Sequence, residues 1–258
     1  MSLELFNLTG RVAVVMGGTS GIGRTLALGL AEAGADVVAM GRRAEKVEEV
    51  AAAIERAGRR TLRQTVNAAE RASIDALRDT VLENLGRVDI LVNSAGQIFR
   101  KPTVQITETE WNNLLDVNLT GTLRACQSFY EPLAASGHGR VVNIASLNSY
   151  VSFLEVTAYA ASKAGVLGLT RSLAVEWAPK GISVNAIAPG VFRTELNSGL
   201  LDGTERGREL LLRTPMKRFG NISELVGLGL LLASDAASFI TGQCVAVDGG
   251  FLASGVNQ

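Results

Sequence analysis

A glycine-rich turn between a short apolar run and a helical segment constrains the fold more than any other part of the chain. The run Arg11–Met16 is rich in β-branched residues, which favours a strand that is buried on both faces of a parallel sheet. Gly17, Gly21 and Gly23 follow, and a helical pattern then runs to Gly34. Such glycines let the backbone approach a pyrophosphate, and a helix N-terminus offers it unpaired N–H groups. The alternative is a tight turn that binds nothing.

The rest of the chain repeats this alternation of strands and helices. We expect further strands at residues 35–41, 60–66, 88–92, 140–145, 182–187 and 243–247, and further helices at residues 44–57, 73–85, 108–133, 156–177 and 224–232. Seven strands that alternate with helices predict an α/β fold with a doubly wound parallel sheet. No linker, repeat or low-complexity tract interrupts the 258 residues, so we expect a single domain over residues 1–258.

The charge balance and the cysteines indicate which kinds of ligand and which cellular compartment to expect. Lys plus Arg and Asp plus Glu number 25 each, which gives no electrostatic reason to expect a nucleic acid or an anionic membrane. Cys126 and Cys244 lie in apolar runs without metal-ligand spacing, and we interpret both as buried thiols of a reducing compartment; His138 is expected to be a solvated loop residue. No targeting segment or long apolar run is present. We therefore expect a cytoplasmic protein that acts on a small molecule and binds no metal.

Tyr159 and Lys163 form the candidate catalytic pair. Residues four apart lie on one face of a helix, so the spacing places a phenol beside an ammonium group. A nearby positive charge lowers the pKa of a tyrosine, which would let Tyr159 exchange a proton with an alcohol or an alkoxide. Ser146, at the end of an apolar run, could donate a hydrogen bond to the same oxygen. The alternative is an ordinary surface pair.

Six motifs in order resemble those of the short-chain dehydrogenase/reductase family over essentially the whole chain. They are Gly17-x-x-x-Gly21-Ile-Gly23, Asn93-Ser-Ala-Gly96, Asn118, Ser146, Tyr159-x-x-x-Lys163 and Pro189-Gly190. The resemblance implies a Rossmann-type fold, a nicotinamide cofactor, and hydride transfer between that cofactor and a secondary alcohol or ketone. It also implies a homotetramer, and the helices that carry Asn118 and Tyr159 are apolar on more than one face, as a subunit contact requires.

The resemblance also implies a role for individual residues. Tyr159 would be the acid/base, Lys163 would lower its pKa and hold the nicotinamide ribose, Ser146 would orient the reacting oxygen, and Asn118 would anchor a proton-relay water. The cofactor would be contacted by Gly17, Thr19, Ser20, Gly21, Ile22, Gly23, Arg42, Arg43, Asn67, Ala68, Asn93, Ala95, Gly96, Tyr159, Lys163, Pro189, Gly190, Val191 and Thr194. Met16 and Asn67 depart from the family pattern, which commonly has Thr and Asp at these positions.

The residues after the second strand bear on the choice of cofactor. An acidic residue there would bind the ribose 2′-hydroxyl of NAD, but this chain has Gly41, Arg42 and Arg43. Guanidinium groups can bind a 2′-phosphate, so NADP(H) is favoured over NAD(H). The alternative is that both arginines are solvated charges at a helix start.

Two segments are candidates for setting the substrate. Residues 191–215 carry three glycines beyond the end of a strand and are expected to form a lid; the alternative is a plain surface excursion. Arg100 follows another strand and could hold a carboxylate through two parallel hydrogen bonds. The alternative is a solvated Arg100, or one paired with Glu108 or Glu110.

The substrate residues we expect are Arg100, Ser146, Asn148 and Tyr159, and Glu155 and Arg193 could also face the pocket. The Arg100 loop, the helix that follows it, and the ending Val247-Asp-Gly-Gly-Phe are similar to those of gluconate 5-dehydrogenases and 2-deoxygluconate 3-dehydrogenases. A sugar-acid substrate follows from that resemblance. A reductase of carrier-bound 3-oxoacyl groups is the alternative enzyme, and a dinucleotide-binding regulatory protein is the alternative outside enzymes, although Ser146, Tyr159 and Lys163 are all present.

Overall fold

Six parallel strands form one sheet in the computed structural model, which describes residues 3–193 and 198–255. In chain order they are β1 (Val12–Met16), β2 (Asp36–Met40), β3 (Ile90–Asn93), β4 (Arg140–Ile144), β5 (Ser183–Pro189) and β6 (Cys244–Val247). Their spatial order is β2-β1-β3-β4-β5-β6. The chain leaves β1 for β2 and returns on the other side of β1 as β3. The carboxyl ends of β1 and β3 therefore flank a topological switch point, where ligands bind in open α/β sheets.

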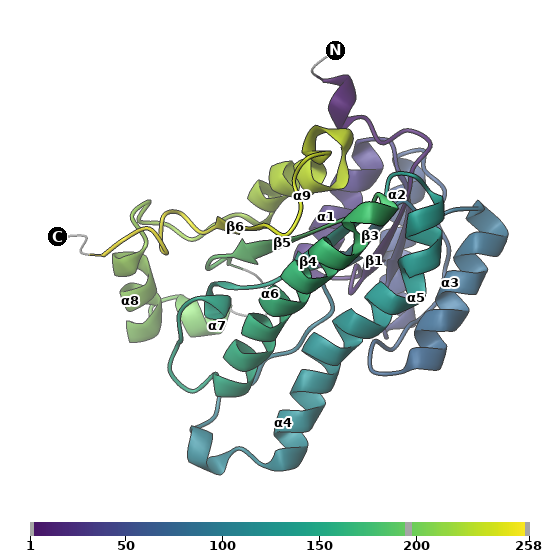
Figure 1. Cartoon of the computed structure of the whole chain (residues 1–258). Helices are drawn as coiled ribbons and strands as arrows, with labels where there is room; N and C mark the ends of the chain where they lie inside the picture. The colour runs from purple at the N-terminus through teal and green to yellow at the C-terminus, as the bar shows by residue number, and fades with distance from the viewer. Residues whose placement is uncertain (1–2, 194–197, 256–258) are drawn as a thin grey trace.

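Helices cover both faces of the sheet (Figure 1). They are α1 (Gly21–Glu32), α2 (Ala44–Arg56), α3 (Arg71–Leu85), α4 (Glu108–Leu115), α5 (Gly121–Ala135), α6 (Thr157–Trp177), α7 (Ser198–Leu201), α8 (Glu205–Arg213) and α9 (Val226–Ala233). One apolar core joins the sheet to α1, α2 and α9, and a second joins it to α3, α5 and α6. Because each central strand contributes residues to both cores, β1 is buried along its whole length, as its β-branched sequence predicts. No described helix is long and apolar enough to cross a membrane.

The strand expected at residues 60–66 is absent, so the described sheet has six strands and the predicted seven is wrong. The segment runs beside β2 but hydrogen bonds to its neighbourhood only near its two ends, where Arg60 O accepts from Val37 N (3.1 Å) and Val66 N donates to Gly41 O (2.9 Å). Between these points Arg63 turns outward and binds two carboxylates of α2. The charged side chain is held by the helix, and no continuous strand ladder forms.

The long helix expected at residues 108–133 is interrupted. It consists of α4, a π-turn (Asp116–Thr120) and α5, and Asn118 lies inside the π-turn. A π-turn adds a residue to one helical turn and commonly occurs at functional sites. The turn packs closely against the segment after residue 66, because a Cβ atom at Gly121 would lie 2.9 Å from Ala68 O.

Two minor expectations also change. Cys126 is buried as predicted, but Cys244 is only half-buried because β6 is the outer strand of the sheet. His138 is not simply solvated, since its Nδ1 lies 3.0 Å from Asp235 Oδ1. Neither change affects the carboxyl ends of the strands.

The expected lid at residues 191–215 contains α7 and α8, beyond the carboxyl end of β5 (Figure 1). The hydroxyl of Thr204 caps α8 by accepting a hydrogen bond from Gly207 N (2.9 Å). Leu201 and Leu210 of these helices pack in a separate apolar cluster with Leu147 and Phe251. The cluster joins the lid helices to the loop that follows Ser146.

Candidate active site

The turn after β1 forms a cradle with little space for side chains. Gly17 has a φ of +75°, and a Cβ atom there would lie 2.6 Å from Ala95 N. A Cβ atom at Gly23 would overlap with Gly17 O, so neither position accepts a larger residue without movement. Ser20 starts α1 without a side-chain capping bond. The first N–H groups of α1 therefore remain available, together with the positive end of the helix, to a phosphate.

Asn93 at the end of β3 lies inside the protein and not on the cleft. Its Nδ2 donates to Asn143 Oδ1 (2.9 Å) on β4 and approaches Cys126 Sγ (3.3 Å). Its Oδ1 is buried without a hydrogen bond to any described residue. The expected contact between Asn93 and the adenosine ribose remains a prediction, since the side chain here links two strands. The backbone after it does reach the cleft, because a Cβ atom at Gly96 would lie 3.7 Å from Lys163 Nζ.

Asn118 holds that backbone in place. Its Oδ1 accepts from Gln97 N (2.8 Å), and its Nδ2 donates to Gln97 O (2.9 Å) and to Ser162 Oγ (3.1 Å) on α6. Both N–H groups of the amide are thus used within the protein. In this structure the Asn118 side chain positions the loop after β3 against α6. The proton-relay water expected here would therefore have to hydrogen bond to the main-chain carbonyl of Asn118.

Ser146, Tyr159 and Lys163 meet where β4 ends. Lys163 Nζ donates to Ile144 O (2.7 Å), the last residue of the strand, and lies 5.7 Å from the centroid of the Tyr159 ring. The Ser146 hydroxyl hydrogen bonds to the Tyr159 phenol and also accepts from Asn148 N (3.1 Å). Residues that are far apart in the sequence, on the loop after β4 and on α6, are therefore brought together as predicted. Asn118 completes the set through its bond to Ser162 on the same helix.

Burial dominates the acid–base properties of this group. It lowers the pKa of the buried Lys163 from 10.5 to about 8. It also raises the pKa of Tyr159 above its ordinary value, while the hydrogen bond from Ser146 acts in the opposite direction. The sequence led us to expect a lowered tyrosine pKa; here desolvation of the phenolate outweighs the favourable contacts. Tyr159 is therefore protonated at neutral pH in this structure, which suits proton donation to a carbonyl oxygen.

The residues expected at the adenosine end surround the carboxyl end of β2. Arg42 and Arg43 are both exposed, and neither guanidinium group is joined by a hydrogen bond or ion pair to another described residue. Asn67 is occupied locally, since its Nδ2 donates to Glu70 Oε1 (2.6 Å) and its Oδ1 accepts from Ala69 N (3.2 Å). The two arginines are thus available to an anionic group.

Among the candidate substrate residues, Asn148 and Arg193 are bound within their own segments, whereas Arg100 pairs with a residue from a different segment. The Asn148 side chain is buried and donates to Val151 O (3.1 Å) in its own loop, and Arg193 pairs with Asp202 (2.6 Å). Arg100 lies in the loop after β3, and its Nε is 2.7 Å from Glu155 Oε2 in the turn before α6. The partner is therefore neither Glu108 nor Glu110. Thr194, expected beside the carboxamide, lies outside the described residues.

Comparison with known proteins places the chain in a family. The family model described as enoyl-(acyl carrier protein) reductase matches residues 17–252. The 2-dehydro-3-deoxy-D-gluconate 5-dehydrogenase of Escherichia coli K12 is 40% identical over 256 residues, which cover 98% of this chain and 100% of that protein. The chain belongs to the short-chain dehydrogenase/reductase family. It is an NAD(P)-dependent oxidoreductase that acts on a CH–OH donor.

Other members of the short-chain dehydrogenase/reductase family are similar over the full length. The gluconate 5-dehydrogenase of Gluconobacter oxydans is 36% identical and covers 97% of this chain and 98% of its own length. The crystal structure of a gluconate 5-dehydrogenase from Burkholderia cenocepacia in complex with NADP and tartrate has 38% identity and a TM-score of 0.94, and the alignment covers 99% of this chain and 100% of that one. The fold is therefore shared with a solved NADP-bound enzyme.

The cradle of this short-chain dehydrogenase fits a dinucleotide. The loops after β1 and β3 lie so close together that a Cβ atom added at Gly17 would overlap with Ala95. The N-terminus of α1, which has no side-chain cap, lies at the same end of the sheet. Gly17 to Gly23 would hold the phosphates, and Lys163 would hold the nicotinamide ribose close to Tyr159. The bound nicotinamide supplies or accepts the hydride.

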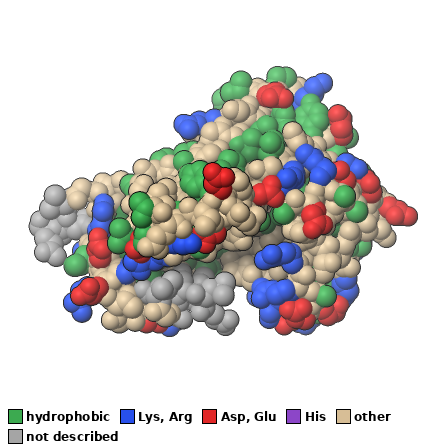
Figure 2. All heavy atoms as spheres, turned by 90° about the horizontal axis from the view of Figure 1, so that it is seen from below, with side chains coloured by type: hydrophobic (Ala, Val, Ile, Leu, Met, Phe, Trp, Pro, Cys, Tyr) green, Lys and Arg blue, Asp and Glu red, His purple; other side chains and the backbone are tan. Residues whose placement is uncertain are grey.

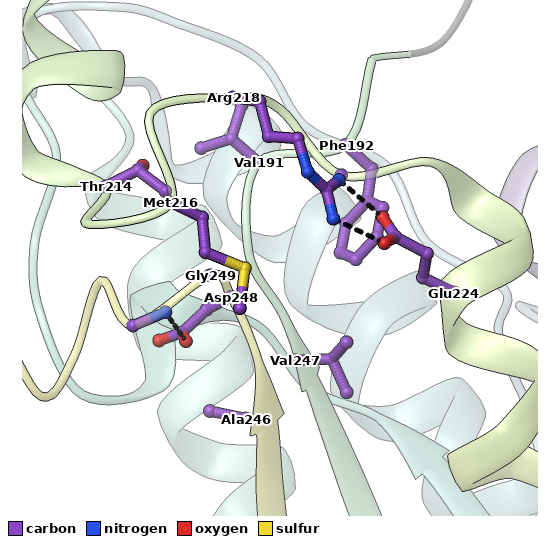
Figure 3. Close-up of a pocket in the computed structure, with 12 residues that line it drawn as sticks. Val191, Phe192, Thr214, Met216, Arg218, Glu224, Ala246, Val247, Asp248 and Gly249 are labelled. Carbon is purple, nitrogen blue, oxygen red and sulfur yellow. Dashed lines mark hydrogen bonds and ion pairs between the residues drawn. The ribbon is translucent and has the colours of Figure 1, made fainter.

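One cavity of about 350 Å³ is lined partly by residues that the sequence patterns did not single out, among them Met216, Arg218 and Glu224. It lies beyond the ends of β5 and β6 (Figure 3), and its lining includes Val191, Phe192, Thr214, Met216, Arg218, Glu224, Val247, Asp248 and Gly249. Its charged groups already have partners. The two Nη atoms of Arg218 donate to the two carboxylate oxygens of Glu224 (2.6 and 2.8 Å), and Asp248 Oδ1 accepts from Gly250 N (2.8 Å). The Asp-Gly-Gly sequence after β6 was the available signal, because turn residues after a strand mark the ligand-binding edge of such a sheet.

Proposed function

We propose that this protein is an NADP(H)-dependent dehydrogenase of a sugar acid, acting on an aldonic or keto-aldonic acid as its gluconate 5-dehydrogenase relatives do. The observation that carries this proposal is the state of Arg100, in the loop after β3. Its Nε pairs with Glu155, while no hydrogen bond joins its Nη1 or Nη2 to any other residue in the described parts of the chain. These terminal nitrogens suit a substrate carboxylate.

The chain's own residues account for the proton transfer. In reduction, the Oη of Tyr159 gives its proton to the carbonyl oxygen that the Ser146 hydroxyl orients, and hydride addition at the carbon completes the alcohol. In oxidation, the phenolate takes the proton from the alcohol. Lys163, fixed on Ile144 O at 2.7 Å, keeps its ammonium beside the tyrosine and favours the phenolate that reduction leaves.

A preference for NADP(H) over NAD(H) is part of the proposal. It is supported by the exposed Arg42 and Arg43 after β2 and by the lack of an acidic residue at Gly41. Two further relatives with solved structures, a gluconate 5-dehydrogenase from Beutenbergia cavernae and a 2-deoxy-D-gluconate 3-dehydrogenase from Agrobacterium tumefaciens, both of them putative by name, are bound to NADP. Measurement of kcat/KM with both cofactors side by side tests the preference.

The expected homotetramer and cytoplasmic location also remain proposals. Val175 on α6 is 81% exposed although it is apolar, and a second copy of α6 would cover it. Light scattering at micromolar concentration tests the assembly; a monomer there contradicts it.

Reduction of carrier-bound acyl groups is the second candidate, because the matching family model carries that description. An acidic carrier protein would need a basic landing surface. Figure 2 shows Lys and Arg side chains intermingled with Asp and Glu side chains on the face it presents, which does not favour that surface.

The decisive experiment is a substrate panel. Purified protein is assayed with D-gluconate, 5-keto-D-gluconate, neutral polyols and 3-oxoacyl thioesters, each with both cofactors. A higher kcat/KM for sugar acids than for the matching polyols supports the proposal. Turnover of the 3-oxoacyl thioesters alone would show instead that the protein reduces carrier-bound acyl groups.

A further inference from the structure

Arg206 on the lid helix α8 has surroundings that the proposed function does not yet explain. It is only half-exposed, and no hydrogen bond or ion pair joins its guanidinium to another residue within 3–193 and 198–255. Its guanidinium carbon lies 5.9 Å from the centroid of the Phe153 ring. A partly desolvated guanidinium that is stacked on an aromatic face is held in position with its N–H groups available.

The ring that supports Arg206 is itself fixed. Phe153 packs edge-on against Phe251 with ring centroids 5.8 Å apart, and Arg213 lies 5.1 Å above the Phe251 ring. Two arginines of α8 thus enclose a pair of aromatic rings that come from the loop after β4 and from the segment after β6. This stack ties the lid helix to the loop that carries Ser146.

Arg100 approaches the same place from the loop after β3. The charges of Arg100 and Glu155 both act on Arg206: together with burial, Arg100 lowers the pKa of Arg206, and Glu209 and Glu155 raise it. The backbone connects this group to the reaction site, because Lys101 N donates to Glu155 O (2.8 Å) and Glu155 lies in the turn just before α6, the helix that carries Tyr159. Two guanidinium groups from different segments, the loop after β3 and α8, therefore lie close enough to Glu155 and to each other for their charges to interact.

We propose that Arg206 and Arg100 together bind the carboxylate of the substrate, with Arg206 as the residue through which the lid recognises an acid. The inference rests on the proposed function and extends it by assigning the lid a charged contact. The like charges of Arg100 and Arg206 are mutually unfavourable, and a substrate carboxylate between them relieves more of this repulsion than Glu155 and Glu209 do alone. A neutral polyol offers no such gain. Binding of an acid therefore favours the position of α8 in which Arg206 meets Arg100.

Tartrate and threitol provide a matched pair of probes, because both are four-carbon chains with hydroxyl groups on the two central carbons. The two end carbons are carboxylates in tartrate and hydroxymethyl groups in threitol. Each is titrated by calorimetry into NADP⁺-saturated wild-type protein and into the variants Arg206→Gln, Arg206→Lys and Arg208→Gln. Arg208 is an exposed arginine on the same helix and serves as the control. The melting temperature of each variant is measured in parallel to establish that it is folded.

We expect Arg206→Gln to weaken tartrate binding by about 10- to 100-fold, the effect of losing a charge-assisted hydrogen bond. Arg206→Lys should lie between Arg206→Gln and wild type, since it keeps the charge without the planar fork. Threitol affinity and the Arg208→Gln variant should stay within about twofold of wild type. Unchanged tartrate affinity in Arg206→Gln, an equal loss in Arg208→Gln, or wild-type threitol affinity as high as that for tartrate would overturn the proposal.

Kinetics separate this inference from the proposed function. If wild-type protein oxidises no sugar acid, the proposed function fails, while calorimetry still decides whether the two arginines bind a carboxylate. If D-gluconate is a substrate and Arg100→Gln selectively impairs it, but Arg206→Gln leaves its kcat/KM unchanged, the proposed function stands and the role of Arg206 is wrong.

Discussion

The hydroxyl of Thr19 fills the space that a side chain at Gly41 would need. A Cβ atom at Gly41 would overlap with Thr19 Oγ1 and lie 3.1 Å from Thr19 Cγ2. Thr19 is only 6% exposed, so it cannot simply swing into solvent. The glycine turn after β1 therefore prevents an acidic residue from taking the position at the end of β2 that would recognise NAD.

A single substitution at Gly41 should consequently not convert the enzyme to NAD⁺. Gly41→Asp alone is expected to weaken both NAD⁺ and NADP⁺, because the new side chain displaces the cradle. Gly41→Asp combined with Thr19→Ala removes the overlap and should shift the ratio of kcat/KM values toward NAD⁺ by at least about tenfold, or about 1.4 kcal/mol. A single variant that uses NAD⁺ well and keeps its melting temperature would show that Thr19 is no barrier.

Arg42 should contribute only to the phosphorylated cofactor. Arg42→Ser is expected to lower kcat/KM with NADP⁺ by about 10- to 100-fold, the equivalent of about 1.5–3 kcal/mol for a hydrogen bond to a charged group, and to leave NAD⁺ almost unaffected. Arg56→Ser is the matched control, since Arg56 is exposed at the C-terminal end of α2, the helix that begins two residues after Arg42. Equal losses with both cofactors would assign Arg42 a structural role.

Tyr159 is expected to be essential for turnover but not for cofactor binding. Tyr159→Phe removes the proton donor and should reduce kcat by about 10²–10⁴-fold or more, while NADPH affinity measured by fluorescence stays within about threefold. Tyr150→Phe is the control, since Tyr150 is exposed and its hydroxyl reaches only Cys244 O at 3.4 Å. Near wild-type activity of Tyr159→Phe would refute the mechanism.

Local patterns explain which parts of the fold the sequence predicts well. The turn from Gly17 to Gly23 and the pair Tyr159–Lys163 depend on residues close together in the chain, and both lie as expected. The segment 60–66 looks equally strand-like, but its Arg63 is bound by two carboxylates of α2, and its backbone bonds to the neighbourhood of β2 lie only near its two ends. A pattern within one segment carries no information about such a distant partner.

The same reasoning applies to the candidate site. Arg100 pairs with Glu155 because the two loops are joined through a backbone bond, whereas the nearby Glu110 is already bound by Lys101 and by the cap residue Thr107. The π-turn at Asn118 likewise depends on bonds to residues outside the helix. Sequence reasoning identifies the residue types at the site, and long-range contacts decide which of them are free to act.

Asp235 should be important for stability, although it lies far along the chain from its partners. Its Oδ1 accepts from His138 Nδ1 (3.0 Å) and Arg140 Nη2 (3.3 Å), and the Arg140 side chain is buried. Asp235→Ala leaves that guanidinium without its charged partner and should lower the free energy of unfolding by about 1–3 kcal/mol. Urea denaturation measures the change. Asp79→Ala, which removes an exposed ion pair, should change it by less than about 0.5 kcal/mol; equal effects would contradict the assignment.

Lys163 is expected to reduce stability while serving catalysis. Burial lowers its pKa from 10.5 to about 8, so the folded protein holds this proton less tightly than the unfolded chain. Below the folded-state pKa both states are protonated and the buried charge has its full cost. As pH rises from the folded-state value toward the unfolded value of 10.5, that cost disappears.

Lys163→Met should therefore raise the free energy of unfolding at pH 7 by about 1–3 kcal/mol even though it abolishes turnover, because each pKa unit is worth about 1.4 kcal/mol and the lost hydrogen bond to Ile144 O offsets part of the gain. The gain should shrink when urea denaturation is repeated at a pH near 10. Lys180→Met is the control, since Lys180 is exposed in the turn after α6. A Lys163→Met variant that is less stable than wild type at pH 7 would mean that the bond to Ile144 outweighs the desolvation of the ammonium group.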